Sequence, residues 1–212
     1  IGYTAGSALV EGSSNVAVGY QALMTEDAHG ANTAIGYNAL AVQNAGADAY
    51  NVAVGYNAGV SVTTGTFNTI TGGLAGDAIT TGNYNTAFGA SALSSEDTHS
   101  GNTAIGRRAL MTLNAGADGY NTAVGYDVGL SMSTGIYNTL MGASAGVALT
   151  TGSYNVALGA DALKTEDTGS RSIAIGVGAL QVQNNDANNY NIAIGHMTGN
   201  AVSTGIDNVL LG

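Results

Sequence analysis

The chain repeats a short pattern: one polar residue, three residues that alternate in size, and a glycine. Its first full occurrence is Asn15-Val16-Ala17-Val18-Gly19, where large β-branched residues flank an alanine. Alternation with a period of two is typical of a short β-strand with unlike faces. The apolar positions nowhere keep the three-to-four-residue spacing of an amphipathic helix, and glycine recurs too often for one. The pattern therefore predicts strands and turns, and no helix.

This pentapeptide occurs twelve times, at steps of 17, 19, 17 and 17 that recur as a 70-residue cycle. The asparagines at its first position are Asn15, Asn32, Asn51, Asn68, Asn85, Asn102, Asn121, Asn138, Asn155, Asn191 and Asn208. The glycines at its last position are Gly19, Gly36, Gly55, Gly72, Gly89, Gly106, Gly125, Gly142, Gly159, Gly176, Gly195 and Gly212. Such self-similarity indicates a repeat architecture.

A unit this short cannot bury its own apolar face, so successive units must stack as coils. We therefore predict an all-β fold, a parallel β-solenoid of about twelve 17–19-residue coils. Residues 1–212 would form one repetitive domain of three cycles, approximately 1–70, 71–140 and 141–212. Each coil is expected to contain the strand, a tight turn, a second short strand near Ala22-Leu23 and a loop. Stacked asparagines would form an amide ladder, and the glycine would require a positive φ or a close backbone neighbour.

Once in each cycle the small central residue of the strand is replaced by a bulky one: Ile70, Leu140 or Leu210. This periodic bulk predicts a layer that packs against something outside the coil, most simply symmetry-related copies of the chain. We therefore expect an intertwined or side-by-side homotrimer, with a single-chain solenoid as the alternative.

The motif also resembles known repeats over essentially the whole chain. Ser172-Ile173-Ala174-Ile175-Gly176 and its Asn-Thr-Ala-Ile-Gly siblings resemble the head repeat of YadA-like trimeric autotransporter adhesins. The longer string from Asn32 to Leu40 is similar to repeats of tailed-phage fibre proteins. The resemblance implies a left-handed parallel β-roll, three subunits about an axis, and an extracellular position on a virion or a bacterial cell surface.

Composition narrows the class further. Glycine accounts for 33 of 212 residues, proline and cysteine are absent, and 45% of residues are hydrophobic, which excludes disorder, collagen and a disulfide framework. A net charge of −10 argues against nucleic acid as a partner, and no apolar run is long enough for membrane insertion. We expect no cofactor, and we interpret the chain as a segment of a longer fibre protein.

Acidic pairs are the main candidate chemistry, because one recurs in the same loop of each cycle. They are calcium-ligand candidates, although we favour a solvated acidic loop, since pairs four coils apart cannot share an ion. The pairs are Glu26-Asp27, Glu96-Asp97 and Glu166-Asp167. His29 and His99 lie one full cycle apart in these loops, but Gly169 takes their place in the third cycle, so we expect exposed loop residues there, as at His196.

Two other patterns are assigned structural roles. Gly142-Ala143-Ser144-Ala145-Gly146 matches the nucleophile elbow of hydrolases, but the previous cycle has Gly72-Gly73-Leu74-Ala75-Gly76, so we expect no enzyme. The eleven tyrosines either form a row for glycan binding or stack from coil to coil, and we expect stacking.

The function expected from these features is non-enzymatic. The segment would form the shaft or head of a trimeric extracellular fibre, a virion tail fibre that supports host attachment. The alternative is a bacterial surface adhesin head that binds host matrix or glycans directly. The expected partner besides further copies of the chain is a cell-surface glycan or protein receptor. A further alternative is an ice-binding solenoid, although Thr33 and Thr69 alternate with Val16 and Val52 rather than forming ranks.

Overall fold

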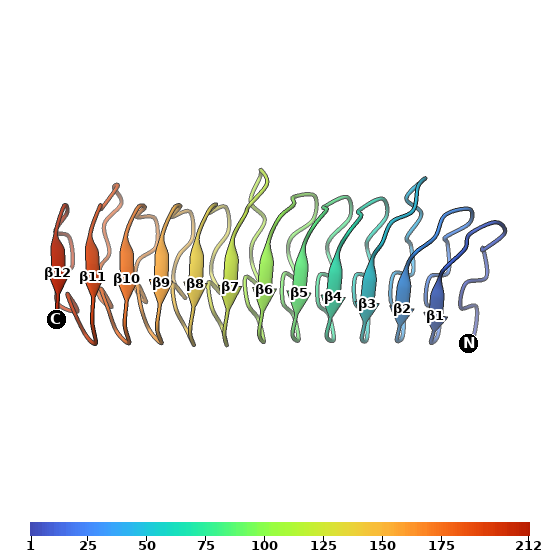
Figure 1. Cartoon of the computed structure of the whole chain (residues 1–212), viewed down its shortest axis with the longest axis horizontal. Helices are drawn as coiled ribbons and strands as arrows, with labels where there is room; N and C mark the ends of the chain where they lie inside the picture. Colours follow the sequence, from blue (N-terminus) through green and yellow to red (C-terminus); the bar gives the residue numbers. More distant parts are fainter.

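The computed structural model describes residues 1–212 as a rod of stacked coils, each with one three-residue strand (Figure 1). All twelve strands form a single parallel sheet in sequence order, and there is no helix. The predicted all-β parallel solenoid is therefore confirmed. The strands are β1 (Val16–Val18), β2 (Thr33–Ile35), β3 (Val52–Val54), β4 (Thr69–Thr71), β5 (Thr86–Phe88), β6 (Thr103–Ile105), β7 (Thr122–Val124), β8 (Thr139–Met141), β9 (Val156–Leu158), β10 (Ile173–Ile175), β11 (Ile192–Ile194) and β12 (Val209–Leu211).

The register of the sheet follows the sequence repeat. Val16 of β1 pairs with Thr33 of β2, and Thr33 pairs with Val52 of β3. The 17-residue and the 19-residue steps therefore both bring the chain to the equivalent position in the next coil. The longer coils place their two extra residues in the loop, because the strands remain paired residue for residue. The predicted coil lengths and the 70-residue cycle are thus confirmed.

The sequence pattern predicts a second short strand opposite the sheet. This prediction is wrong, because each coil contains only one strand. Gln21 and Leu23 have φ angles of 55° and 50°, and equivalent residues repeat this left-handed conformation in other coils. A segment in which every second residue has a left-handed backbone conformation cannot form an extended strand. Their N–H groups still bond between coils, from Gln21 to the carbonyl of Tyr3 and from Leu23 to that of Ala39. The wall opposite the sheet is therefore a stack of turns joined by hydrogen bonds.

The glycine after each strand meets both conditions that the sequence suggested. Gly106 has a φ of 130°, which side chains rarely adopt, and a Cβ placed on it would overlap the carbonyl oxygen of Gly125 in the next coil. Its own N–H donates to the carbonyl of Phe88 in the coil before, at 2.7 Å. Backbone therefore packs directly on backbone at this corner, and no side chain fits.

The predicted outward layer of Ile70, Leu140 and Leu210 is wrong. Ile70 and Leu140 are buried inside the coils, and Leu210 packs against the same core. The reason is the volume available inside, because the turns that face Ile70 carry Gly59 and Gly76 where other coils carry leucine. A Cβ on these glycines would lie 2.9 Å and 3.3 Å from Ile70 Cδ1, so the isoleucine occupies the space that the missing leucines leave.

The asparagine ladder forms, although it connects side chains to backbone more than to one another. The side-chain oxygen of Asn51 accepts the N–H of Asn68 in the next coil at 2.8 Å. Its amide donates to the carbonyl of Gly65 at 2.7 Å, which closes the loop of its own coil. Most of the repeat asparagines link two coils and fix one loop in this way, and the pattern is interrupted at Ser172, whose hydroxyl accepts a bond from the Gln183 amide at 2.9 Å.

The close contact at the glycine corner predicts the effect of a substitution there. Gly106→Val is expected to lower the free energy of unfolding by about 2 kcal/mol or more, because the strained φ and the overlap with Gly125 both oppose the valine side chain. Thermal or urea unfolding measures the change.

The adjacent substitution Arg107→Ala is the control, since this side chain is 53% exposed and lies over the Tyr126 ring. It is expected to be close to neutral. Equal melting temperatures for the two variants would contradict the role assigned to the glycine.

Candidate functional site

The acidic loops are not fully solvated, because each of them buries its glutamate side chain. Glu26, Glu96 and Glu166 are fully buried, whereas the aspartates that follow Glu26 and Glu96 are exposed or half-buried. Each glutamate accepts the N–H of the residue three positions later through Oε1, at 2.9–3.3 Å. The expectation of solvated pairs is therefore wrong for the glutamates, because this local hydrogen bond draws their carboxylates under the loop.

Two of the loops bring a histidine to the buried glutamate. His99 Nδ1 lies 2.8 Å from Glu96 Oε1, and its side chain is only 17% exposed, so the expectation of an exposed histidine is wrong here. His29 Nδ1 lies 3.8 Å from Glu26 Oε1. Burial raises the pKa of Glu26, and this effect is partly opposed by the hydrogen bond from His29. His196 is exposed, as expected.

The third loop satisfies its glutamate in another way. Glu166 Oε2 accepts hydrogen bonds from the amides of Gln183 at 2.7 Å and Asn189 at 2.9 Å. The corresponding oxygens of Glu26 and Glu96 have no hydrogen-bond partner. The third loop thus satisfies, with two side-chain amides, a carboxylate oxygen that has no partner in the first two loops.

These loops do not match the ligands that calcium prefers. Glu26, Asp27 and His29 place one ligand atom each within 4.8 Å of one another, as do Glu96, Asp97 and His99. Calcium takes six to eight oxygen ligands, whereas each group supplies two carboxylates and a nitrogen. The carboxylates also accept backbone N–H groups already. We therefore interpret the loops as structural, with the glutamate as the internal acceptor.

The aromatic side chains stack from coil to coil, as predicted. Neighbouring ring centroids are 4.9–5.3 Å apart and the planes differ by 8–20°. One column precedes the repeat asparagines and another follows the repeat glycines. The rings cover one another's faces, so a sugar, which would stack on a face, finds mainly ring edges and hydroxyl groups. The stacked groups are Tyr3-Tyr20-Tyr37-Tyr56, Tyr50-Phe67-Tyr84 and Tyr120-Tyr137-Tyr154.

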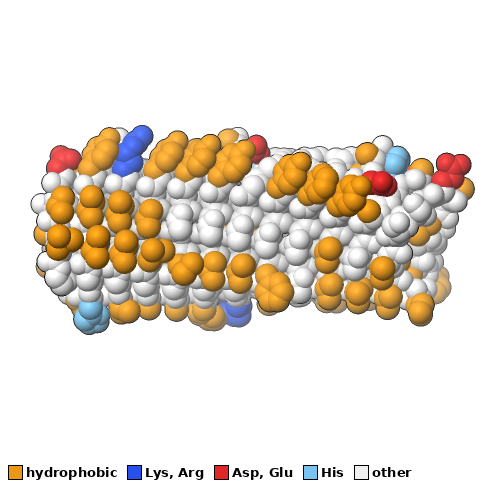
Figure 2. Space-filling view, in the orientation of Figure 1, with side chains coloured by type: hydrophobic (Ala, Val, Ile, Leu, Met, Phe, Trp, Pro, Cys, Tyr) orange, Lys and Arg blue, Asp and Glu red, His pale blue; other side chains and the backbone are white.

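The outer face of the sheet is partly apolar. The first and third residues of the strands point outwards, while the middle residue lies in the core. Figure 2 shows two adjacent hydrophobic rows along the sheet at its C-terminal end, over β9–β12. Over β5–β8 the first outward position is threonine, so only one row is hydrophobic there. The most apolar surface is therefore a strip on the last four strands.

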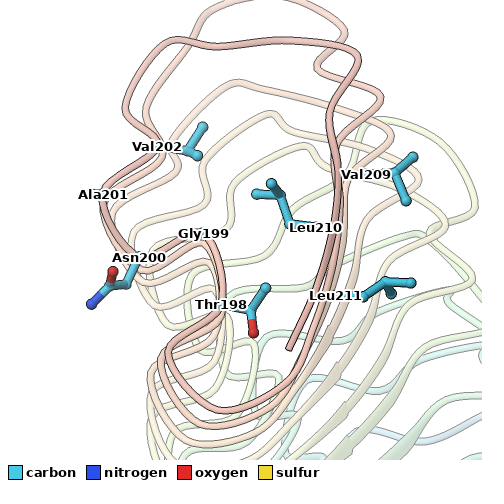
Figure 3. A pocket seen from close by; sticks show the side chains of 8 residues that line it. All are labelled: Thr198, Gly199, Asn200, Ala201, Val202, Val209, Leu210 and Leu211. Atoms are coloured by element: carbon cyan, nitrogen blue, oxygen red, sulfur yellow. The ribbon is translucent and has the colours of Figure 1, made fainter.

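A hollow of about 570 Å³ opens at the C-terminal end of the rod. Figure 3 shows that Leu210 and Val202 point into it from facing walls of the last coil, while Val209 and Leu211 point outwards. In the two earlier cycles, the residues equivalent to Leu210 and Val202 belong to the continuous core and pack against the next coil. The hollow has the character of a coil interior rather than of a ligand pocket.

The hydrolase-like motif lies in one of the stacked turns. Ser144 follows β8, has a φ of 56°, and donates its N–H to the carbonyl of Tyr126 in the coil before. A nucleophile elbow leads from a strand into a helix, and no helix follows here. The turn is thus the ordinary turn of this solenoid.

Comparisons with protein-family models, with curated proteins and with solved structures gave no match to this chain. No segment forms a helix with the length and hydropathy needed to cross a bilayer.

The burial of Glu26 predicts an unusual response to pH. Because the pKa of Glu26 is raised in the folded state, folding favours its protonated form. Its contribution to stability is therefore full at low pH and is lost as the pH rises through the folded pKa. Glu26→Gln is expected to have little effect near pH 4 and to raise the melting temperature relative to the unaltered chain near pH 8.

Glu166→Gln is the matched control. Both oxygens of Glu166 accept hydrogen bonds, so an amide nitrogen at Oε2 would face the donors of Gln183 and Asn189. We expect a loss of about 2 kcal/mol at pH 8. Equal effects of the two substitutions across the pH range would contradict the different environments assigned to the two carboxylates.

Proposed function

We propose that this segment is the shaft or head of a trimeric extracellular fibre, most simply a virion tail fibre, and that it holds a host-binding end away from its base. The role is mechanical and non-enzymatic. The observation that carries the proposal is the unbroken ladder of twelve coils in one register.

That ladder favours a stiff spacer. Of 118 backbone hydrogen bonds, most join residues of neighbouring coils, and the repeat asparagines add further links from β1 to β12. No linker interrupts the stack, so the rod has no internal hinge. Length and stiffness are the properties that a fibre shaft requires.

The proposed trimer is supported by the outer face of the sheet rather than by Ile70 and its equivalents. Among the outward strand residues inside the stack, Ile105 of β6 is 37% exposed, Ile194 of β11 42% and Met141 of β8 48%. Contiguous apolar surface of this kind is typical of an interface. A second and third copy of the chain, packed in parallel about an axis, would cover these strips and keep equivalent coils at the same height.

A bacterial adhesin head that binds glycans or host matrix directly is the second candidate, because the aromatic columns are exposed. The stacked rings offer few free faces for sugars, so we place this function second. An ice-binding surface is less well supported still. The threonines of β4–β8 form a single rank beside a row that contains Phe88 and Met141 rather than a second rank of threonine.

Light scattering tests the trimer. We expect a mass of three times 20.9 kDa for the purified chain. Ile194→Asp is expected to reduce this mass by placing charge in the apolar strip, whereas Val182→Asp, at an equally exposed aliphatic side chain between β10 and β11, should not. A folded monomer of the unaltered chain would reject the trimer.

Removal of one cycle tests the spacer role. Deletion of residues 71–140 joins Ile70 to Met141-Gly142, which takes the place of Thr71-Gly72, so the register continues. We expect a shorter rod with unchanged β-sheet content by circular dichroism. In the intact fibre, a spacer tolerates this deletion without loss of attachment, whereas an adhesin head that binds its receptor along the rod loses binding sites.

A further inference from the structure

The aromatic column that precedes the repeat asparagines has a period of four coils. Three rings are followed by one coil without a ring, and this position is Gly101 in the second cycle and Arg171 in the third. Figure 2 shows the column along one edge of the rod, with a blue basic side chain in line with the orange side chains towards the C-terminus and a gap further along the row. The two interruptions lie one full cycle apart and are therefore equivalent.

We call the space at such a ringless position, between the rings of the two neighbouring coils, the slot. Arg171 shows which kind of side chain the slot can hold. Its guanidinium carbon lies 5.3 Å from the Tyr154 ring centroid on one side and 5.9 Å from that of Tyr190 on the other. The group also donates a hydrogen bond to Asn188 Oδ1. A planar cation between two rings gains cation–π attraction on both faces. Asn188 accepts a hydrogen bond from the edge of the guanidinium group.

The slot at Gly101 has the same walls and lacks the arginine. Tyr84, Tyr120 and Asp118 are the equivalents of Tyr154, Tyr190 and Asn188, each one cycle earlier. All three are exposed. We propose that this slot binds the guanidinium group of an arginine side chain from a partner protein, between Tyr84 and Tyr120 and paired with Asp118.

The dimensions of the column agree with one inserted group. Stacked rings in neighbouring coils lie 5.2–5.3 Å apart, so rings two coils apart leave room for one planar group between them. Tyr120 shows the largest tilt of any stacked ring, 20° from Tyr137, and a Cβ on Gly101 would lie 2.8 Å from its ring. Tyr120 thus leans over the glycine, and binding requires it to swing back.

The charge at the slot favours a cation more strongly than in the third cycle. Asp118 presents a carboxylate where Asn188 presents an amide, and the Tyr120 hydroxyl lies 3.4 Å from this carboxylate. The negative charge of Asp118 raises the pKa of the Tyr120 hydroxyl, which shows that its field reaches the ring. Guanidinium fits better than ammonium, because it is planar, stacks on rings and pairs with a carboxylate in its own plane.

The arginines of this chain are already engaged, which indicates that the occupant comes from another protein. Arg108 pairs with Asp127, Arg107 lies over the Tyr126 ring, and Arg171 fills its own column. The first cycle offers no second site. Ser14 stands there in the place of Tyr84, so the equivalent slot has a ring on one side alone.

A titration followed by NMR of ring-labelled tyrosines tests the proposal, with N-acetyl-arginine amide as the probe. We expect saturable shifts of Tyr84 and Tyr120 at a stoichiometry of one per chain, and at least fivefold weaker binding of N-acetyl-lysine amide. Asp118→Asn should weaken binding several-fold, whereas the equivalent change in the first cycle, Asp48→Asn, should not alter it.

Two reciprocal substitutions make the test specific. Gly101→Arg should fill the slot and abolish the shifts without unfolding the chain, because Arg171 adopts a similar backbone conformation, with a φ of 62° against 79° at Gly101. Arg171→Gly should open the third-cycle slot and raise the stoichiometry to two. Absence of saturable shifts, equal binding of the lysine probe, or unchanged binding by Gly101→Arg would overturn the proposal. A change of mass in light scattering on Gly101→Arg would also overturn it, because the slot would then belong to a contact with another copy of this chain.

Discussion

The close approach of backbone to backbone at the glycine corner is the constraint on which the rest of the molecule depends. At this corner, Gly106 meets the Gly125 carbonyl with no side chain between them. The contact sets the separation of the coils to that of a β-sheet, and every other column along the rod inherits this spacing. Rings at this separation stack, and amides at the same spacing bond to the next backbone N–H. A single steric requirement thus organises the aromatic, polar and apolar columns together.

The interior adds a second requirement, which is volume rather than spacing. A coil is narrow, so one large side chain on the sheet wall must be matched by small ones on the wall of turns. Ile70 with Gly59 and Gly76, and Leu140 with Gly129 and Gly146, show this compensation in two successive cycles. The 70-residue cycle therefore has a physical meaning, because it is the period over which the core volume balances.

Much of this architecture could be predicted from the sequence, because each requirement repeats twelve times. The strands, their register and the need for glycine followed directly from the repeat. The wall of turns could not be predicted, since Leu23 adopts a left-handed conformation that leucine alone does not indicate. The inward position of Ile70 is predictable in principle, because Gly59 and Gly76 stand where other coils carry leucine and leave space for its side chain. The burial of Glu26 depends on a bond to the backbone of its own loop, which has no signature in residue type.

The balance of core volume across several coils also bears on how such a chain can change its length in evolution. Ile70 occupies space that its own coil shares with the coil before it. Duplication of a single coil would therefore either bring a bulky strand residue against a leucine or leave a void next to a glycine. Recombination between copies that lie one cycle apart leaves every neighbour equivalent. The smallest heritable unit of growth is therefore four coils, and rods of this type are expected to vary among genomes in whole cycles.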